Sequence, residues 1–338
     1  MPTLFIGIDP AAERFAAATY RGPQQPERDS AHFVNDFDGF EELTQWMAQH
    51  GATPETSIVC VEATGVYAEA LCYYLHEHGY PVAVEGAHKV KRAFKTTNKN
   101  DPTDARQIAE YAFRYRDELA LWQPKIAIIE QVRVLLTTRE QLVRQLGINR
   151  NMRKMLTHKV IQTPVANTLL EQTIAHLKDQ IKAIEQEIRR LIGQDPSLSE
   201  LLTLLVSIPS VGLLLSAHLL VVTDGFQREV TARQLAAYLG ICPYEHTSGK
   251  SVRKRSKSRG YGPPVLRKLV YLAALGLKQH QAKYQRYYAQ KVAEGKSGRL
   301  VLNNISNKLL RVICAVVRDR RPYEKNYRSV SPQALRAA

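Results

Sequence analysis

Cysteine is scarce in this chain: there are only four, and no two form a Cys-x-x-Cys pair. This scarcity argues against a disulfide framework and against a zinc site built from thiolates. The ten histidines show no metal-ligand spacing apart from His76 and His78, which we assign to the exposed side of a helix. The opening residues, Met1 to Leu4, lack the basic region of a secretory signal, so we expect a cytoplasmic protein.

An uninterrupted apolar run is also missing. The stretch from Leu201 to Val222 carries no formal charge and is long enough to span a bilayer. It is broken in the middle by Pro209, Ser210 and Gly212, however, and contains further polar residues. We therefore predict two short buried helices joined by a tight turn, and no association with a membrane.

Acidic residues are absent between His246 and Ala293, although the whole chain contains 32 of them and its formal net charge is +15. A region in which all the charge is positive attracts polyanions, and nucleic acid is the commonest polyanion in a cell. A merely solvated basic surface is the alternative. The residues that we expect to bind nucleic acid are Lys250, Arg253, Lys254, Arg255, Lys257 and Arg259.

Patterns typical of strands and helices alternate in the first 120 residues. Apolar runs predict strands at residues 4–8, 15–20, 31–34, 57–61 and 81–84. Amphipathic patterns predict helices at residues 37–49, 66–77 and 101–116. Three successive strands followed by alternating helices and strands indicate an α/β domain at residues 1–120, with a mixed sheet and helices on both faces.

A heptad pattern marks residues 121–195 as a separate helical region. Its apolar positions recur at alternating spacings of four and three residues, and a poorer version covers residues 132–156. The break at Thr163-Pro164 between the two helices predicts either an antiparallel hairpin within one chain or a coiled coil that joins subunits. The heptad positions are Leu170, Ile174, Leu177, Ile181, Ile184, Ile188 and Leu191.

Residues 196–330 predict a mostly helical C-terminal domain. Ser207 to Gly212 is typical of a helix-hairpin-helix turn, whose backbone amides bind phosphate, although a structural turn between core helices would have the same pattern. Tyr284, Tyr287 and Tyr288 lie among basic residues. They would either stack on nucleic-acid bases or pack inside the domain.

Four carboxylates stand at positions where they could form a catalytic site. Asp9 ends the first predicted strand, Glu62 follows the strand at residues 57–61, and Asp101 and Asp104 begin a helix, on which residues three apart share a face. Sites in such folds lie at strand ends on one edge of the sheet. Each acid alone would be explained as a turn or helix cap. Together they predict a site for Mg²⁺ or Mn²⁺ that acts on phosphodiesters.

Five segments carry a family resemblance: Gly7–Asp9, Val61–Tyr67, Asn98–Arg106, Ser207–Gly212 and Thr247–Arg253. They resemble the Asp-Glu-Asp-Asp transposases of the IS110 insertion sequences, in the expected order and over nearly the whole chain. The resemblance implies a RuvC-like N-terminal domain of the ribonuclease-H type, whose four acids bind Mg²⁺. Ser210 departs from the family, whose members more often have glycine there.

The same resemblance implies that a serine of the C-terminal domain attacks the DNA, and that a structured noncoding RNA of bridge type guides the choice of target and donor. It points to Ser248, the serine directly before Gly249. Residue patterns alone leave the choice open, and a hydroxyl that only bonds to a DNA phosphate is the alternative role. The candidates in the basic tract are Ser248, Ser251, Ser256 and Ser258.

The sequence as a whole predicts a DNA transposase that cuts and rejoins strands, with DNA, a guide RNA and further copies of itself (a homodimer or homotetramer) as partners. One alternative is a structure-selective nuclease in which water attacks. Another is a non-catalytic nucleic-acid-binding protein, which would not need the acids. An actin-like ATPase shares the Gly-x-Asp opening, but it requires a later glycine-rich phosphate loop, and only Gly260-Tyr261-Gly262 is present.

Overall fold

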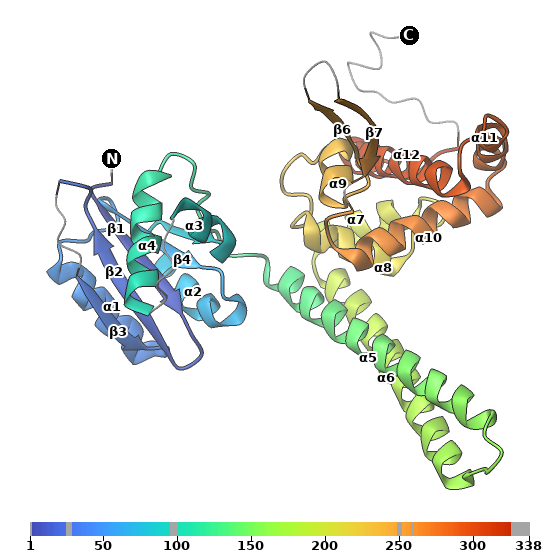
Figure 1. Cartoon of the computed structure of the whole chain (residues 1–338), viewed down its shortest axis with the longest axis horizontal. Helices are drawn as coiled ribbons and strands as arrows, with labels where there is room; N and C mark the ends of the chain where they lie inside the picture. The colour runs from blue at the N-terminus through green and yellow to red at the C-terminus, as the bar shows by residue number, and fades with distance from the viewer. Residues whose placement is uncertain (1, 25–28, 95–100, 249–251, 259, 326–338) are drawn as a thin grey trace. The chain divides into compact units, whose positions relative to one another are not determined.

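The computed structural model describes residues 2–24, 29–94, 101–248, 252–258 and 260–325. Within these ranges the backbone alone is described at residues 101–102, 245–248 and 252–257. The chain divides into two compact units, Met1–Pro124 and Lys125–Ala338 (Figure 1). Each unit has its own hydrophobic core.

A five-stranded mixed sheet forms the centre of the first unit, with the order β3-β2-β1-β4-β5 in the described residues. The first three strands pair antiparallel, and β4 and β5 continue the sheet in parallel with β1. The predicted mixed sheet is confirmed, with strand ends that differ by at most two residues. The strands are β1 (Leu4–Pro10), β2 (Arg14–Tyr20), β3 (Ser30–Val34), β4 (Ser57–Glu62) and β5 (Val82–Glu85).

Helices cover both faces of this sheet, as predicted. Side chains alternate along β1, so Leu4, Ile6 and Ile8 pack on one face with helices α1 (Phe37–Gln49) and α2 (Glu69–Glu77). Phe5 and Cys60 lie on the opposite face, where they pack with helices α3 (Ala87–Ala93) and α4 (Asp101–Arg114). The central strand is therefore buried on both sides.

The structure of this unit differs from the prediction in two places. The helix expected at residues 66–77 begins with a separate 3₁₀ turn, η1 (Gly65–Ala68), and α2 starts only at Glu69. Gly65, the first residue of η1, has a φ of 74°, in the left-handed region, so the chain turns sharply where η1 begins. Helix α3 was not predicted, because Val90 is its single buried residue and no apolar period marks it.

Helix α4 lies directly against β1 at Gly7. A Cβ atom on Gly7 would lie 2.2 Å from the Ala105 carbonyl oxygen and 2.2 Å from the Ala109 nitrogen, so a residue without a side chain is required there. Nearer the start of β1, the rings of Phe5 and Phe113 meet with centroids 5.5 Å apart. Helix α4 therefore runs antiparallel to β1, and its N-terminus lies at the carboxyl end of that strand.

The second unit begins with an antiparallel hairpin of helices α5 (Ala127–Thr157) and α6 (Pro164–Gln194) (Figure 1). Pro164 stands in the first turn of α6, where its missing N–H costs nothing. Arg139 of α5 forms an ion pair with Glu185 of α6 at 2.7 Å. The hairpin within one chain, one of the two predicted alternatives, is therefore present, and contact between subunits stays a prediction. The buried heptad positions are Ile174, Leu177, Ile188 and Leu191.

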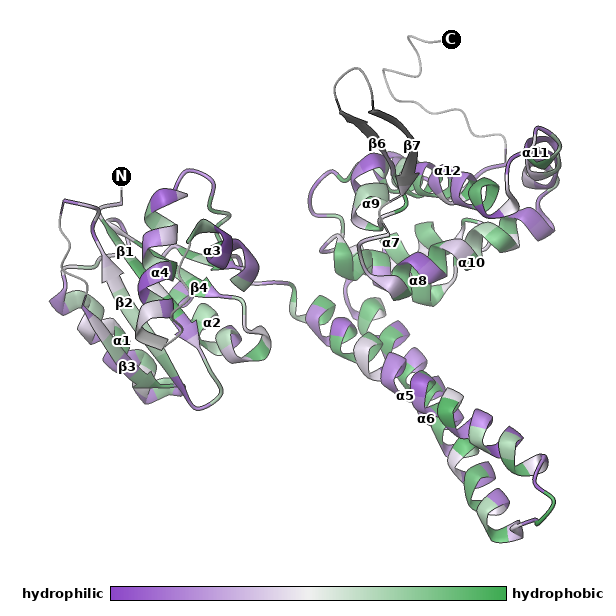
Figure 2. Ribbon diagram, in the orientation of Figure 1, coloured by the Kyte–Doolittle hydropathy of each residue, from purple (hydrophilic) through white to green (hydrophobic). Residues whose placement is uncertain are grey.

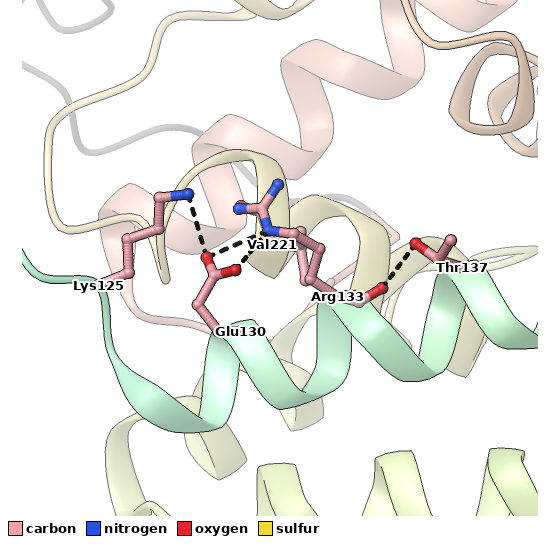
Figure 3. A network of polar contacts seen from close by, with 5 residues as sticks. All are labelled: Lys125, Glu130, Arg133, Thr137 and Val221. Carbon is pink, nitrogen blue, oxygen red and sulfur yellow. Dashed lines mark hydrogen bonds and ion pairs between the residues drawn. The ribbon is translucent and has the colours of Figure 1, made fainter. Parts of the chain in front are cut away.

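A polar network fixes the base of α5 to helix α8 (Leu213–Val222) (Figure 3). The Glu130 carboxylate pairs with the Lys125 ammonium at 3.1 Å and with the Arg133 guanidinium at 3.1 Å. Arg133 also donates to the Val221 carbonyl oxygen, 3.4 Å away, in the last turn of α8. Carbonyls at a helix end have no partner within the helix, so this bond satisfies one of them.

In the rest of the second unit, as far as the structure describes it, six helices pack around a single core. Helices α7 and α8 are the two short buried helices predicted for the uncharged stretch, and Figure 2 shows α8 as hydrophobic over most of its length. Helix α12 is long and apolar enough to cross a membrane by length and composition. Its apolar side chains, such as Ile305 and Leu310, are buried in this core instead. The helices are α7 (Pro196–Val206), α8, α9 (Ala232–Tyr238), α10 (Pro264–His280), α11 (Ala282–Ala293) and α12 (Gly298–Asp319).

Substitution of Gly7 by Ala tests the contact between α4 and β1. We expect the free energy of unfolding of the first unit to fall by about 1–3 kcal/mol, because the added methyl group collides with the α4 backbone. The chain's two tryptophans, Trp46 and Trp122, both lie in this unit, so urea unfolding followed by tryptophan fluorescence reports on it alone.

The matched control is Gly147→Ala in α5, where an added Cβ meets no atom within 4 Å. This change should leave the fluorescence transition where it is and stabilise its own helix by about 1 kcal/mol. An unaltered transition in Gly7→Ala would show that α4 does not lie so close to β1.

Candidate functional site

Asp9 and Glu62 occupy neighbouring positions at the carboxyl edge of the sheet. Ile8 pairs with Val61 in the parallel register, so Asp9 and Glu62 are the next residues on their two strands. Because side chains alternate along a strand, Asp9 shares the face of Gly7, and Glu62 shares the face of Cys60. Both acids are partly buried on the face that α4 covers.

The first turn of α4 lies at the same edge. Ala105 and Ile108 face the sheet and are 0% exposed. Asp101 and Asp104 precede these two residues by one helical turn, so they occupy the same side of the helix. The backbone therefore brings all four predicted acids to one edge of the sheet. The side chain of Asp101 lies outside the described residues, and that of Asp104 is partly buried.

Glu85 is a further acid beside this edge that the sequence analysis did not select. It stands next to Glu62 in the register of β4 and β5. Its buried carboxylate accepts a hydrogen bond of 2.8 Å from the Lys89 ammonium, and this bond raises the pKa of Lys89. Burial, aided by the negative charge of Glu85, raises the pKa of the Cys60 thiol to about 12. The Glu-to-Lys spacing of four residues was the available signal.

The donor atoms at this edge suit a hard divalent cation. Asp9, Glu62 and Asp104 offer carboxylate oxygens, and Mg²⁺ is usually held by one or two carboxylates together with waters. The Thr64 hydroxyl, two residues beyond Glu62, is buried without a hydrogen-bond partner in the described structure. Among the described side chains, which exclude that of Asp101, no three acids, histidines or cysteines form a metal-binding cluster. The residues fit an ion that keeps part of its water.

The basic tract forms a two-stranded antiparallel ribbon, β6 (Pro243–Ser248) and β7 (Val252–Ser258), in a region where we predicted mostly helix. Charged residues follow one another along β7, so the apolar alternation that marks a strand is absent. Ser248 is the last residue of β6 and pairs with Val252. The predicted residues that lie outside the described ranges are Lys250, Ser251 and Arg259.

The turn at residues 207–212 joins α7 to α8, as predicted. Ser210 has a φ of 66°, a conformation that favours glycine, which gives a physical reason for the family's preference at this position. The turn is packed within its own unit: the Ser207 hydroxyl accepts a bond of 2.8 Å from the Tyr323 backbone N–H. A Cβ on Gly276 of α10 would lie 2.8 Å from the Ser210 hydroxyl. These contacts favour the structural alternative for the turn.

The three tyrosines of α11 make contacts within the domain, which was the second of the two predicted alternatives. Tyr284 is 9% exposed in the core. The rings of Tyr287 and Tyr288 are partly buried. The Lys308 ammonium lies over the Tyr287 ring, 4.8 Å from its centroid, and the Lys278 ammonium lies over the Tyr288 ring, 4.9 Å from its centroid. These cation–π contacts within the chain occupy ring faces that a base would need for stacking.

A sheet edge with several carboxylates and a basic ribbon in the same chain are features that suit an enzyme acting on the phosphodiester bonds of nucleic acid. Comparison with known proteins narrows the class to DNA transposases. A family model described as a transposase matches residues 6–161, and one described as the transposase IS116/IS110/IS902 family matches residues 202–289. The chain belongs to this IS110 transposase family, as its motifs predicted, and is a DNA transposase or recombinase.

Two relatives agree with this assignment. The pilin gene-inverting protein of Moraxella lacunata is 30% identical over 331 residues, which cover 96% of this chain and 99% of that protein. The transposase for insertion sequence element IS1328 of Yersinia enterocolitica is 24% identical over 307 residues, 81% of this chain and 86% of that protein. The structure of Thermus thermophilus RuvC aligns with 35% of this chain and 99% of its own, at 14% identity and a TM-score of 0.26.

Reversal of charge at Arg253, Arg255 and Lys257 tests the ribbon as the main contact to DNA phosphate. Each lost phosphate contact should reduce the slope of log affinity against log salt concentration by about 0.9 on duplex DNA. The control reverses Lys178, Lys182 and Arg189, which are exposed on α6, and so changes the net charge equally. A slope that stays the same in the ribbon variant would place the phosphate contacts elsewhere, with residues 89–99 as our second choice.

Proposed function

We propose that this transposase cuts and rejoins DNA with a divalent cation held by Asp9, Glu62, Asp101 and Asp104. The observation that supports this proposal is their common sheet edge, which results from the parallel register of β1 with β4 and from the contact of α4 with Gly7. Mg²⁺ or Mn²⁺ bound there would offset the repulsion between the acids and stabilise charge on the attacking and leaving oxygens.

We propose Ser248 as the nucleophile. Its hydroxyl oxygen would attack the phosphorus of the scissile phosphodiester, and the deoxyribose oxygen would leave with a proton. The phosphoserine ester formed in this way preserves the energy of the broken bond, so a deoxyribose hydroxyl can later displace the serine without ATP. Residues 249–251 connect Ser248 to the basic strand β7, whose cations would hold the phosphate.

DNA binding is assigned to the ribbon of β6 and β7. A two-stranded ribbon fits the major groove of B-form DNA, and Arg253, Arg255 and Lys257 alternate along β7. Rejoining also suits the relative that is named a pilin gene-inverting protein, because inversion of a DNA segment requires that the cut strands be joined again. We further propose a structured noncoding RNA as guide, and a homodimer or homotetramer as the working assembly, in keeping with the family resemblance.

Single substitutions of the four acids test the metal site. We expect Asp9→Ala, Glu62→Ala, Asp101→Ala and Asp104→Ala each to abolish strand cleavage while DNA binding persists, because binding depends on the second unit. Cleavage by the wild type should require Mg²⁺ or Mn²⁺ and stop when a chelator is added. Glu41→Ala, which removes an exposed acid of α1, is the matched control and should cleave normally. Wild-type cleavage in any two of the four variants would refute the assignment.

If Ser248 is the nucleophile, the reaction passes through a covalent protein–DNA intermediate that can be detected. Denaturing gels of wild-type reactions should show protein linked to labelled DNA, and Ser248→Ala should show none, because alanine has no hydroxyl oxygen to attack the phosphorus. Ser258→Ala, in the same ribbon, should retain the linked species. A linked band in Ser248→Ala would mean that another residue attacks. Free DNA ends without any linked band in the wild type would favour the nuclease, in which water attacks.

A further inference from the structure

Asn35 connects three segments of the chain at the edge that carries Asp9 and Glu62. It directly follows β3, and its backbone N–H donates to the Glu13 carbonyl oxygen at 2.9 Å, next to the ladder between β2 and β3. Its side-chain nitrogen donates to the carbonyl oxygens of Ala11, at 2.8 Å, and of Tyr67, at 3.0 Å. One amide group therefore joins two backbone segments that are far apart in the sequence.

These two segments are the ones that follow the acids. Ala11 comes two residues after Asp9, in the turn between β1 and β2. Tyr67 belongs to η1, which follows Glu62 at the end of β4. Strand β1 lies between β2 and β4 in the sheet, so the Asn35 side chain extends from the edge strand β3 past the end of β1 to the segment after β4.

The backbone around Asn35 is held firmly. The neighbouring Asp36 caps α1, with its carboxylate accepting a bond of 2.9 Å from the Gly39 N–H. A Cβ on Gly39 would lie 2.0 Å from the Val34 carbonyl oxygen, so α1 begins directly against the end of β3. The Asn35 amide is thus presented from a fixed position, which is what a group that orients others requires.

The chemistry of an amide suits this position. Carboxylates on adjacent strand ends repel each other, and a third charge nearby would change the affinity of the edge for a cation. The side-chain amide of Asn is neutral and carries two N–H donors on one nitrogen, which match the two carbonyl acceptors. It joins the two segments without altering the charge that the cation meets.

We propose that Asn35 is a positioning residue for the metal-binding acids: by joining Ala11 to Tyr67, it fixes the spacing of Asp9 and Glu62 before the metal binds. This inference rests on the proposed metal site and adds a residue to it that does not touch the metal. A bond with a purely structural role would change the stability of the fold and leave the metal affinity of the folded protein unchanged.

Calorimetric titration of the full-length chain with Mn²⁺ separates these two roles. Groups that orient metal ligands typically change metal affinity 10- to 100-fold, so we expect the Kd for Mn²⁺ to rise about tenfold in Asn35→Ala. Asn35→Gln retains both donors on a longer side chain and should show a smaller rise. Thermal unfolding of each variant checks that the folded state is the one titrated.

Asn149→Ala is the matched control, because the Asn149 side chain also donates to a backbone carbonyl, that of Gln145 at 2.9 Å, but within α5. Its Mn²⁺ affinity should equal that of the wild type. A wild-type affinity in Asn35→Ala would overturn the inference. In that case, loss of Mn²⁺ binding in Asp9→Ala would show that the proposed metal site exists although Asn35 does not position it. If Asp9→Ala also binds Mn²⁺ normally, the proposed metal site fails and the role of Asn35 fails with it.

Discussion

The packing of α4 on β1 is the constraint on which the architecture of the first unit depends. The absence of a side chain at Gly7 allows the helix backbone to approach the strand, and the antiparallel direction of α4 then determines which end of the helix meets the carboxyl edge of the sheet. Asp101 and Asp104 are distant from Asp9 in the sequence. Their common location is a consequence of packing between two backbones, and it needs no direct contact between the acids.

The acids of the proposed metal site lie in the first unit, and the basic tract lies in the second. The first unit gathers negative charge at one sheet edge, where repulsion makes a divalent cation favourable. The second unit contains the tract from His246 to Ala293, in which every formal charge is positive. Positive charge in the second unit attracts a polyanion, and in the proposed mechanism a cation offsets the repulsion between that polyanion and the acids of the first unit. The proposed mechanism therefore assigns binding and cutting to different residues, which can be substituted separately.

Much of the fold was predictable because its local patterns are strong. Helix α1 was predicted at its observed bounds from the spacing of Phe40, Leu43 and Met47, which are all buried. The ribbon of β6 and β7 and helix α3 were missed because their residues are mainly polar and charged, without an apolar period. The four acids could be selected because strand ends are visible in a sequence. The spacing of Glu85 and Lys89 is visible in the sequence, but it does not place Glu85 at that edge. The positions of Glu85 and Asn35 there depend on strand register and on hydrogen bonds between segments that only the folded chain brings together.

The hairpin of α5 and α6 is long compared with one turn of duplex DNA. Each helix has 31 residues, and at 1.5 Å per residue the hairpin is about 46 Å long. One turn of duplex DNA covers about 34–36 Å. A molecule held at the connection between the helices would therefore lie more than a full duplex turn from the polar network at the base of α5. Removal of two residues from each helix would shorten the hairpin by about 3 Å, which is close to the rise of one base pair along a duplex.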